Sequence, residues 1–240
     1  MSTSLEGAKV VVAGGAGGVG EGIVRSLLRQ GARVLATSRS EEKLKGLTEY
    51  CAGITTGELL TAAGDLGDEE SARALQHKVF ERFRELDLAV ATLGGWWQGR
   101  PLTSVDVAIW DRILRENLTA HFLAIKMLVP LLHPKTGSYV HINGFSAEEP
   151  YPMAGPVAMA SAAQKSMVQT LAEELKPTGI RVYELILGPM QTRRRIRQGE
   201  TPPDWYKPEE VGDQIVDLVT RRDGQLIHRL ASKRDAWKVN

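Results

Sequence analysis

The sequence has little of several features that would place a protein in a special class. Its single cysteine, Cys51, excludes a disulfide within the chain. The five histidines are scattered, with no spacing typical of metal ligands, so we predict no metal site. No apolar run is long enough to cross a bilayer, and the polar start MSTSLEGAK does not resemble a signal peptide. We therefore predict a cytoplasmic protein that does not bind membranes.

The sequence also lacks an excess of charge of either sign. The 30 Lys and Arg nearly balance the 29 Asp and Glu, so bulk attraction to nucleic acid is not expected. No proline-rich or serine-rich linker and no internal repeat interrupts the 240 residues. We predict one domain over residues 1–240, because that length is enough to bury a sizeable core.

Strand-like apolar runs alternate with helical stretches along the chain. Alternation of this kind predicts parallel strands joined by right-handed crossovers. The fold class we predict is α/β: a single Rossmann-type doubly wound domain, with a seven-stranded parallel sheet and helices on both faces. Its ligand should lie at the carboxyl ends of the strands. The predicted strands are Lys9–Ala13, Arg33–Thr37, Leu59–Ala63, Leu86–Leu93, Tyr139–Ile142, Ile180–Leu187 and Gln225–Leu230.

A glycine-rich segment follows the first predicted strand and precedes a helical pattern. Glycines allow positive φ and leave no Cβ between the backbone and a pyrophosphate, and a helix N-terminus offers free N–H groups to an anion. Strand, tight turn and helix together predict a dinucleotide cradle. A flexible glycine turn is the alternative. The residues we expect to contact the cofactor here are Gly14, Gly15, Gly18, Val19 and Gly20.

These features resemble the short-chain dehydrogenase/reductase family, and the resemblance runs over nearly the whole chain. The family's Thr-Gly-x-x-x-Gly-x-Gly pattern falls on Ala13, Gly14, Gly18 and Gly20. The run Leu171-Ala172-Glu173-Glu174-Leu175, followed by Gly179-Ile180-Arg181-Val182, matches the family's entry into its sixth strand.

The resemblance assigns roles to five further residues. It implies that Asp65 and Leu66 meet the adenine ring, and that Gly94 belongs to the cofactor loop after the fourth strand. Asn117, in the predicted helix Trp110–Leu132, matches the family's helix asparagine. Thr192 matches the threonine that touches the nicotinamide amide.

The family selects its cofactor at the end of the second strand. An acidic residue there would bind both ribose hydroxyls of NAD, but this chain has Ser38 followed by Arg39. A guanidinium suits a 2′-phosphate, so we predict that NADP(H) is favoured over NAD(H). The alternative is that Arg39 is merely solvated.

The family's catalytic serine, tyrosine and lysine are all replaced. Counting back from Thr170-Leu171-Ala172 places Gly144, Val157 and Ser161 at these positions, and the strand Tyr139–Ile142 independently gives Gly144. Of the catalytic tetrad only Asn117 is retained. Valine cannot transfer a proton, although Ser161 could still hydrogen-bond a ribose hydroxyl of the cofactor.

Two residues could substitute for the lost groups. Tyr151 lies in a loop that the family uses for substrate, and Lys165 is one helical turn beyond Ser161. A packing tyrosine and a surface lysine are the alternatives. We take Tyr151 as a candidate proton donor beside Asn117.

Ligands and partners follow from the loops and the long helices. The expected substrate-side loops are residues 94–104, 144–156 and 188–208, and their aromatic residues could hold a small aromatic or apolar ligand or simply pack the core. The basic run after Thr192 could bind an acidic group or face solvent. By resemblance, the helices Trp110–Leu132 and Pro156–Leu175 predict a homodimer or homotetramer.

Two functions from different classes remain open. One is an active NADPH-dependent oxidoreductase that uses a non-standard proton donor on an aromatic or apolar substrate. The other is an NADP(H)-binding protein with weak or absent carbonyl-reductase activity, which acts as a sensor, scaffold or partner subunit. The replaced residues favour the second.

Overall fold

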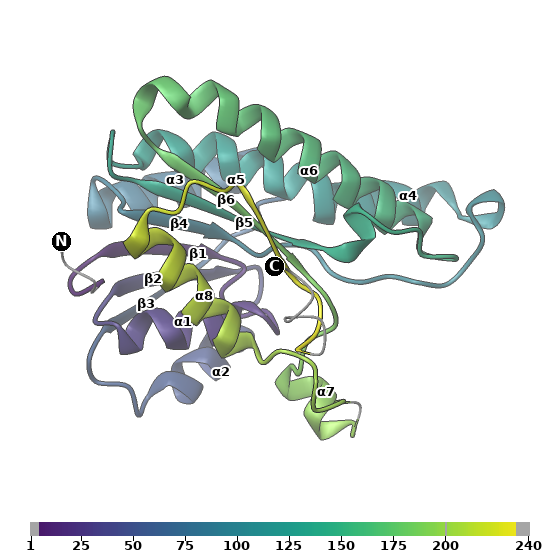
Figure 1. Cartoon of the computed structure of the whole chain (residues 1–240), viewed down its shortest axis with the longest axis horizontal. Coiled ribbons are helices and arrows are strands. Elements are labelled where there is room, and N and C mark those ends of the chain that lie inside the picture. The colour runs from purple at the N-terminus through teal and green to yellow at the C-terminus, as the bar shows by residue number, and fades with distance from the viewer. Residues whose placement is uncertain (1–4, 200, 234–240) are drawn as a thin grey trace.

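The computed structural model describes residues 5–199 and 201–233, and these contain a seven-stranded parallel sheet (Figure 1). The strand order is β3-β2-β1-β4-β5-β6-β7, so the chain reverses its direction of travel across the sheet between β3 and β4. This confirms the predicted fold class. The strands are β1 (Lys9–Ala13), β2 (Arg33–Ser38), β3 (Glu58–Ala63), β4 (Leu88–Ala91), β5 (Ser138–Gly144), β6 (Arg181–Leu187) and β7 (Ile227–Leu230).

Helices cover both faces of this sheet. On one face, α1 (Gly20–Arg29), α2 (Glu41–Cys51) and α8 (Pro208–Arg221) pack against alternate strand residues such as Val10 and Val12. On the other, α3 (Glu69–Phe83), α5 (Ala120–Leu128) and α6 (Gly155–Leu175) pack against the intervening residues. Strands buried on both faces explain why the first strand is a continuous run of valines.

The predicted helix Trp110–Leu132 is longer at its start and is not regular. It begins at Val107 as α4 (Val107–Leu114), passes through a wide π turn (Arg115–Thr119), and continues as α5 and a final 3-10 turn (Val129–Leu131). The π turn brings Asn117 inward, and its backbone carbonyl accepts a hydrogen bond from Gln164 Nε2 at 2.6 Å. The sequence analysis predicted one continuous helix here and did not reveal the π turn.

The other boundaries differ by a few residues. β4 is shorter than the predicted run Leu86–Leu93, because Leu86 forms only an isolated bridge with Leu132. α6 begins one residue before the predicted Pro156. The short helix α7 (Arg193–Arg197) lies in the predicted loop 188–208, whose residue 200 is outside the described residues, as are the ends of the predicted domain. Within the described ranges, no helix has the length and hydropathy to cross a bilayer.

Candidate cofactor site

A cavity of about 280 Å³ lies beyond the carboxyl ends of β1 to β4. This is the expected place for a ligand in an open parallel sheet. It brings together six of the predicted cofactor residues, which come from the glycine loop, the ends of β2 and β3, and the loop after β4. These are Gly14, Ser38, Arg39, Asp65, Leu66 and Gly94.

The glycine loop is packed so closely that side chains would not fit. A Cβ on Gly14, where φ is +81°, would lie 2.2 Å from the carbonyl oxygen of Thr92. A Cβ on Gly20 would lie 2.2 Å from the carbonyl oxygen of Gly14, and one on Gly15 would lie 2.8 Å from Ala36 Cβ. These glycines therefore allow the loop to turn tightly over β2 and β4 at the N-terminus of α1.

The remaining loop residues connect the cradle to Thr192. A Cβ on Gly18 would approach Thr192 Cγ2 at 3.1 Å, so the glycine loop and the segment after β6 lie side by side there. Val19 precedes α1 and packs on the hydrophobic core. Thr192 itself starts α7, because its Oγ1 accepts a hydrogen bond from Arg195 N.

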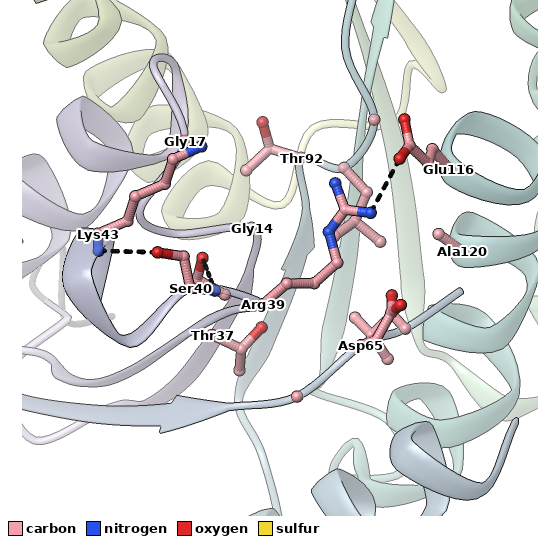
Figure 2. A pocket seen from close by; sticks show the side chains of 15 residues that line it. Gly14, Gly17, Thr37, Arg39, Ser40, Lys43, Asp65, Thr92, Glu116 and Ala120 are labelled. Atoms are coloured by element: carbon pink, nitrogen blue, oxygen red, sulfur yellow. Dashed lines mark hydrogen bonds and ion pairs between the residues drawn. The ribbon is translucent and has the colours of Figure 1, made fainter. Parts of the chain in front are cut away.

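The end of the cavity beside β2 is basic and polar (Figure 2). Ser38 Oγ accepts a hydrogen bond from Ser40 N at 3.2 Å. Arg39 crosses toward the π turn, where its NH1 atom lies 3.1 Å from Glu116 Oε1. Lys43 also lines the cavity. The sequence analysis missed Lys43 and Glu116. Lys43 could have been found from its place in the first turn of the helix after β2, but no local signal pointed to Glu116.

Asp65 shapes the opposite side. Its Oδ1 accepts a hydrogen bond from Gly67 N at 2.8 Å, and its own N–H donates to Ser71 Oγ at 2.7 Å. The turn after β3 is thereby fixed, with Leu66 buried beside it. The cavity therefore has an apolar wall at Leu66 and a carboxylate at Asp65. A flat heterocycle could pack on the first and donate a hydrogen bond from an amino group to the second.

Asn117 holds the loop that follows β4. Its Oδ1 accepts a hydrogen bond from Gly95 N at 3.0 Å, and its Nδ2 donates to the Ile113 carbonyl at 3.1 Å. A Cβ on Gly94 would lie 2.2 Å from Asn117 Oδ1, so only glycine fits there. Both polar atoms of the Asn117 side chain are hydrogen-bonded within the chain, so we assign Asn117 a positioning role.

The three residues predicted to replace the family's catalytic groups, Gly144, Val157 and Ser161, have no acidic or basic side chain. Gly144 ends β5 in an extended conformation, and a Cβ there would have a single near neighbour, Ser146 Oγ at 3.6 Å. Val157 and Ser161 lie on α6 and are each 5% exposed. Ser146 Oγ donates to Ser161 Oγ at 3.0 Å. Ser146, which the sequence analysis missed, therefore places a hydroxyl beside the space where a serine side chain at 144 would be.

A buried polar network lies beneath these residues. Asn143 Nδ2 donates to the Ser161 carbonyl at 3.0 Å and to Glu184 Oε1 at 2.9 Å. Glu184 is fully buried, and burial raises the pKa of its carboxyl above 4.5. Its neighbour across the strands is His141, whose Nε2 lies 3.0 Å from Gln164 Oε1. Burial lowers the pKa of His141 from 6.5 to about 4, so this ring is neutral at pH 7.

Of the two proposed substitutes, Lys165 is held in an ion pair, whereas Tyr151 makes a ring contact. Lys165 Nζ lies 2.7 Å from Glu148 Oε1, and Arg229 binds the same carboxylate. These two cations lower the pKa of Glu148 to about 2. The Tyr151 ring meets Trp96 edge-on with centroids 5.3 Å apart, and burial raises the pKa of its hydroxyl. Lys165 is thus an ion-pair partner of the loop after β5.

Two arginines of the basic run after Thr192 contact different parts of the chain. Arg193 Nε donates to Glu21 Oε1 at 2.7 Å, which fastens α7 to the first turn of α1. Arg195 lies over the Trp205 ring, 5.3 Å from its centroid. These two arginines therefore hold α7 and the loop after β6 against the rest of the chain.

Comparison with known proteins agrees with this geometry. The sequence pattern of the family described as short chain dehydrogenase matches residues 8–202. The chain belongs to this family. The rhamnolipid-biosynthesis 3-oxoacyl-[acyl-carrier-protein] reductase of Pseudomonas aeruginosa is 29% identical to it, over 90% of each chain. Short chain dehydrogenase/reductase dpmpG of Macrophomina phaseolina is 32% identical over 56% of this chain and 78% of its own.

Solved structures of the family have the same fold. A metagenomic short-chain oxidoreductase in complex with NADP superposes with a TM-score of 0.79, at 26% identity, and covers 96% of this chain and 97% of its own. The RhlG protein of Pseudomonas aeruginosa, also solved with NADP, superposes with a TM-score of 0.85 at 24% identity. That alignment covers 95% of this chain and 96% of RhlG.

Proposed function

We propose that this member of the short-chain dehydrogenase/reductase family binds NADP(H) and has weak or absent classical carbonyl-reductase activity. The observation that carries the proposal is the pairing of a well-formed cofactor cavity with Gly144, Val157 and Ser161 at the catalytic positions. Related proteins solved with NADP support a nicotinamide dinucleotide as the ligand.

The residues around the cavity suit such a dinucleotide. Closely packed glycines leave backbone exposed for a pyrophosphate, and Asp65 and Leu66 provide a site for adenine. Two cations, Arg39 and Lys43, lie at the β2 end where the family distinguishes a 2′-phosphate from a hydroxyl. When bound, the cofactor would supply or accept a hydride. The chain's own residues would hold and orient it.

Proton transfer is where the chain departs from its family. Valine has no exchangeable proton, and Ser161, one helical turn further along α6, has a hydroxyl whose ordinary pKa is far above pH 7 and whose Oγ accepts a hydrogen bond from Ser146. Lys165, the cation one turn beyond Ser161, is paired with Glu148, which offsets its effect on the pKa of a serine hydroxyl. Without a poised donor, carbonyl reduction should lose several orders of magnitude in rate.

A second candidate function is an active reductase with a non-standard donor. Ser146 favours it, because its hydroxyl lies beside the position of the lost serine and could polarise a carbonyl. Tyr151 stays a candidate donor for the same reaction. Trp96 is 52% exposed and contacts Tyr151, so a small aromatic or apolar ligand could bind against this pair.

We also propose a cytoplasmic homodimer or homotetramer that pairs through α4, α5 and α6. Phe122 of α5 is 49% exposed, so its ring is available for contact with a second copy of the chain. Small residues on α6, such as Ala158 and Ala162, would allow a second copy to approach closely.

The cofactor proposal is tested by titrating the protein with NADPH and NADH while recording its tryptophan fluorescence. NADPH should bind more tightly, and Arg39→Ala should weaken NADPH by about tenfold or more while leaving NADH nearly unchanged. Arg29→Ala, which removes an exposed arginine at the far end of α1, is the matched control. Equal affinities for the two cofactors would contradict the proposal.

A further inference from the structure

We propose that Glu116 determines how strongly the chain prefers a 2′-phosphorylated cofactor, because its carboxylate competes with that phosphate for Arg39. This inference rests on the proposed function and concerns the same cavity. Glu116 would weaken the binding of a 2′-phosphorylated cofactor, whereas the glycine loop, Arg39 and Lys43 would strengthen it.

The Glu116 carboxylate occupies the guanidinium of Arg39, which would otherwise be free to bind the phosphate of a ligand. Arg39 follows β2 and Glu116 lies on the π turn, 77 positions along the chain, yet NH1 and Oε1 are 3.1 Å apart across the cavity (Figure 2). Both residues line the cavity. A guanidinium binds a carboxylate and a phosphate through the same N–H donors, so the two anions compete for Arg39.

The ion pair is weak enough to be exchanged. The Arg39 side chain is 55% exposed and that of Glu116 is 23% exposed. Pairs that are open to water contribute little stability, and a doubly charged phosphate is the stronger partner for a guanidinium. Glu116 has a second cation within reach, since Arg112 NH1 lies 3.8 Å from its Oε2. Its charge therefore keeps a partner after Arg39 turns to the phosphate.

Lys43 adds a cation that has no competitor. Its ammonium forms no ion pair with any of the residues that the structure describes, and its backbone N–H is bound to Ser40 Oγ at 3.2 Å. In Figure 2 its side chain runs toward Gly17 of the glycine loop. A 2′-phosphate would thus meet Lys43 directly and Arg39 only after Glu116 is displaced. A cofactor with a free 2′-hydroxyl leaves the pair intact.

The test measures the affinity of wild type and Glu116→Gln for NADPH and NADH. Glu116→Gln should bind NADPH about two- to fivefold more tightly, which is the value of an exposed ion pair expressed as affinity, and should change the affinity for NADH by less than about twofold. Glu42→Gln removes the same charge from an exposed position on α2 and should change neither. 2′-AMP against 5′-AMP, which lack the nicotinamide half, should repeat the pattern.

A second comparison separates exchange from simple repulsion. In an Arg39→Ala background, Glu116→Gln should no longer tighten NADPH binding, because there is no guanidinium to release. An equal gain in both backgrounds, an equal gain for NADPH and NADH, or no gain at all would overturn the role of Glu116. If wild type binds neither cofactor, the proposed function itself fails. If wild type binds NADPH through Arg39 and Glu116→Gln is silent, only the present inference fails.

Discussion

Restoring the family's catalytic groups should convert this protein into a carbonyl reductase. The change is Gly144→Ser, Val157→Tyr and Ser161→Lys together. Serine fits at 144, because the backbone there is extended and a Cβ would lie 3.6 Å from its nearest neighbour, Ser146 Oγ.

The two helix positions are tighter. Val157 and Ser161 are each 5% exposed, so tyrosine and lysine must displace neighbours, at a cost of about 1 to 3 kcal/mol each for overpacking. Ser161→Lys also removes the 3.0 Å hydrogen bond from Ser146. The protein should tolerate this loss if its stability is ordinary, which is about 5 to 15 kcal/mol.

The gain in rate can be bounded. One positioned acid or base contributes roughly 100- to 10,000-fold, and the lysine and serine act mainly through the tyrosine, so the three effects do not add. The triple variant should therefore exceed wild type by about 100-fold or more in kcat/KM on at least one small ketone, aldehyde or quinone. Each single reversion should stay within about tenfold of wild type.

The assay follows NADPH consumption across a panel of carbonyl compounds, with NADPH affinity and thermal unfolding measured for each variant. The matched control carries phenylalanine at 157 in place of tyrosine, which keeps the bulk and removes the hydroxyl. If the phenylalanine triple variant is as active as the tyrosine one, the reasoning is wrong. It is also wrong if a folded triple variant that binds NADPH is no faster than wild type.

Three further predictions concern binding, stability and assembly. Gly20→Ala should abolish measurable NADPH binding by titration, because its Cβ would lie 2.2 Å from the Gly14 carbonyl oxygen. The pKa of His141 is about 4 in the folded protein and 6.5 in the unfolded chain, so the free energy of unfolding of wild type should fall by about 3 kcal/mol as the pH falls from 7 to 4. His141→Gln has no imidazole to protonate and should not show this contribution. Denaturant unfolding of wild type and variant at several pH values measures this. If His141 is not neutral when folded, both proteins would show the same change in free energy of unfolding with pH. Light scattering at micromolar concentration should give a dimer or tetramer, and a monomer would refute the proposed assembly.

The fold followed from local patterns that two-sided burial imposes. Valine-rich runs such as Val10–Val12 predicted parallel strands, and the spacing of glycines predicted the turn into α1. Gly144 could be placed at the end of β5 because a strand and a helix gave the same count. The boundaries of β4 could not be placed, since the apolar residues Leu86 and Leu93 lie beyond its two ends and only the partner strands decide where pairing stops.

The rest of the site depends on contacts between distant parts of the chain. Glu116 lies on a π turn and meets Arg39 across the cavity, and the sequence pattern did not predict that turn. Glu184 and Asn143 meet across neighbouring strands, where each looked like an isolated polar residue in an apolar run. Such pairs become visible only when the strand register is known.

The measurement that tests the central claim most directly combines binding and turnover on one preparation of the wild-type protein. We expect tight NADPH binding by fluorescence titration, with almost no NADPH consumption on generic ketones, aldehydes or quinones. Vigorous turnover on a simple carbonyl would contradict the account. It would mean that Ser146, Tyr151 or Lys165 supplies the proton chemistry, and the chain would be an ordinary reductase with an unusual donor.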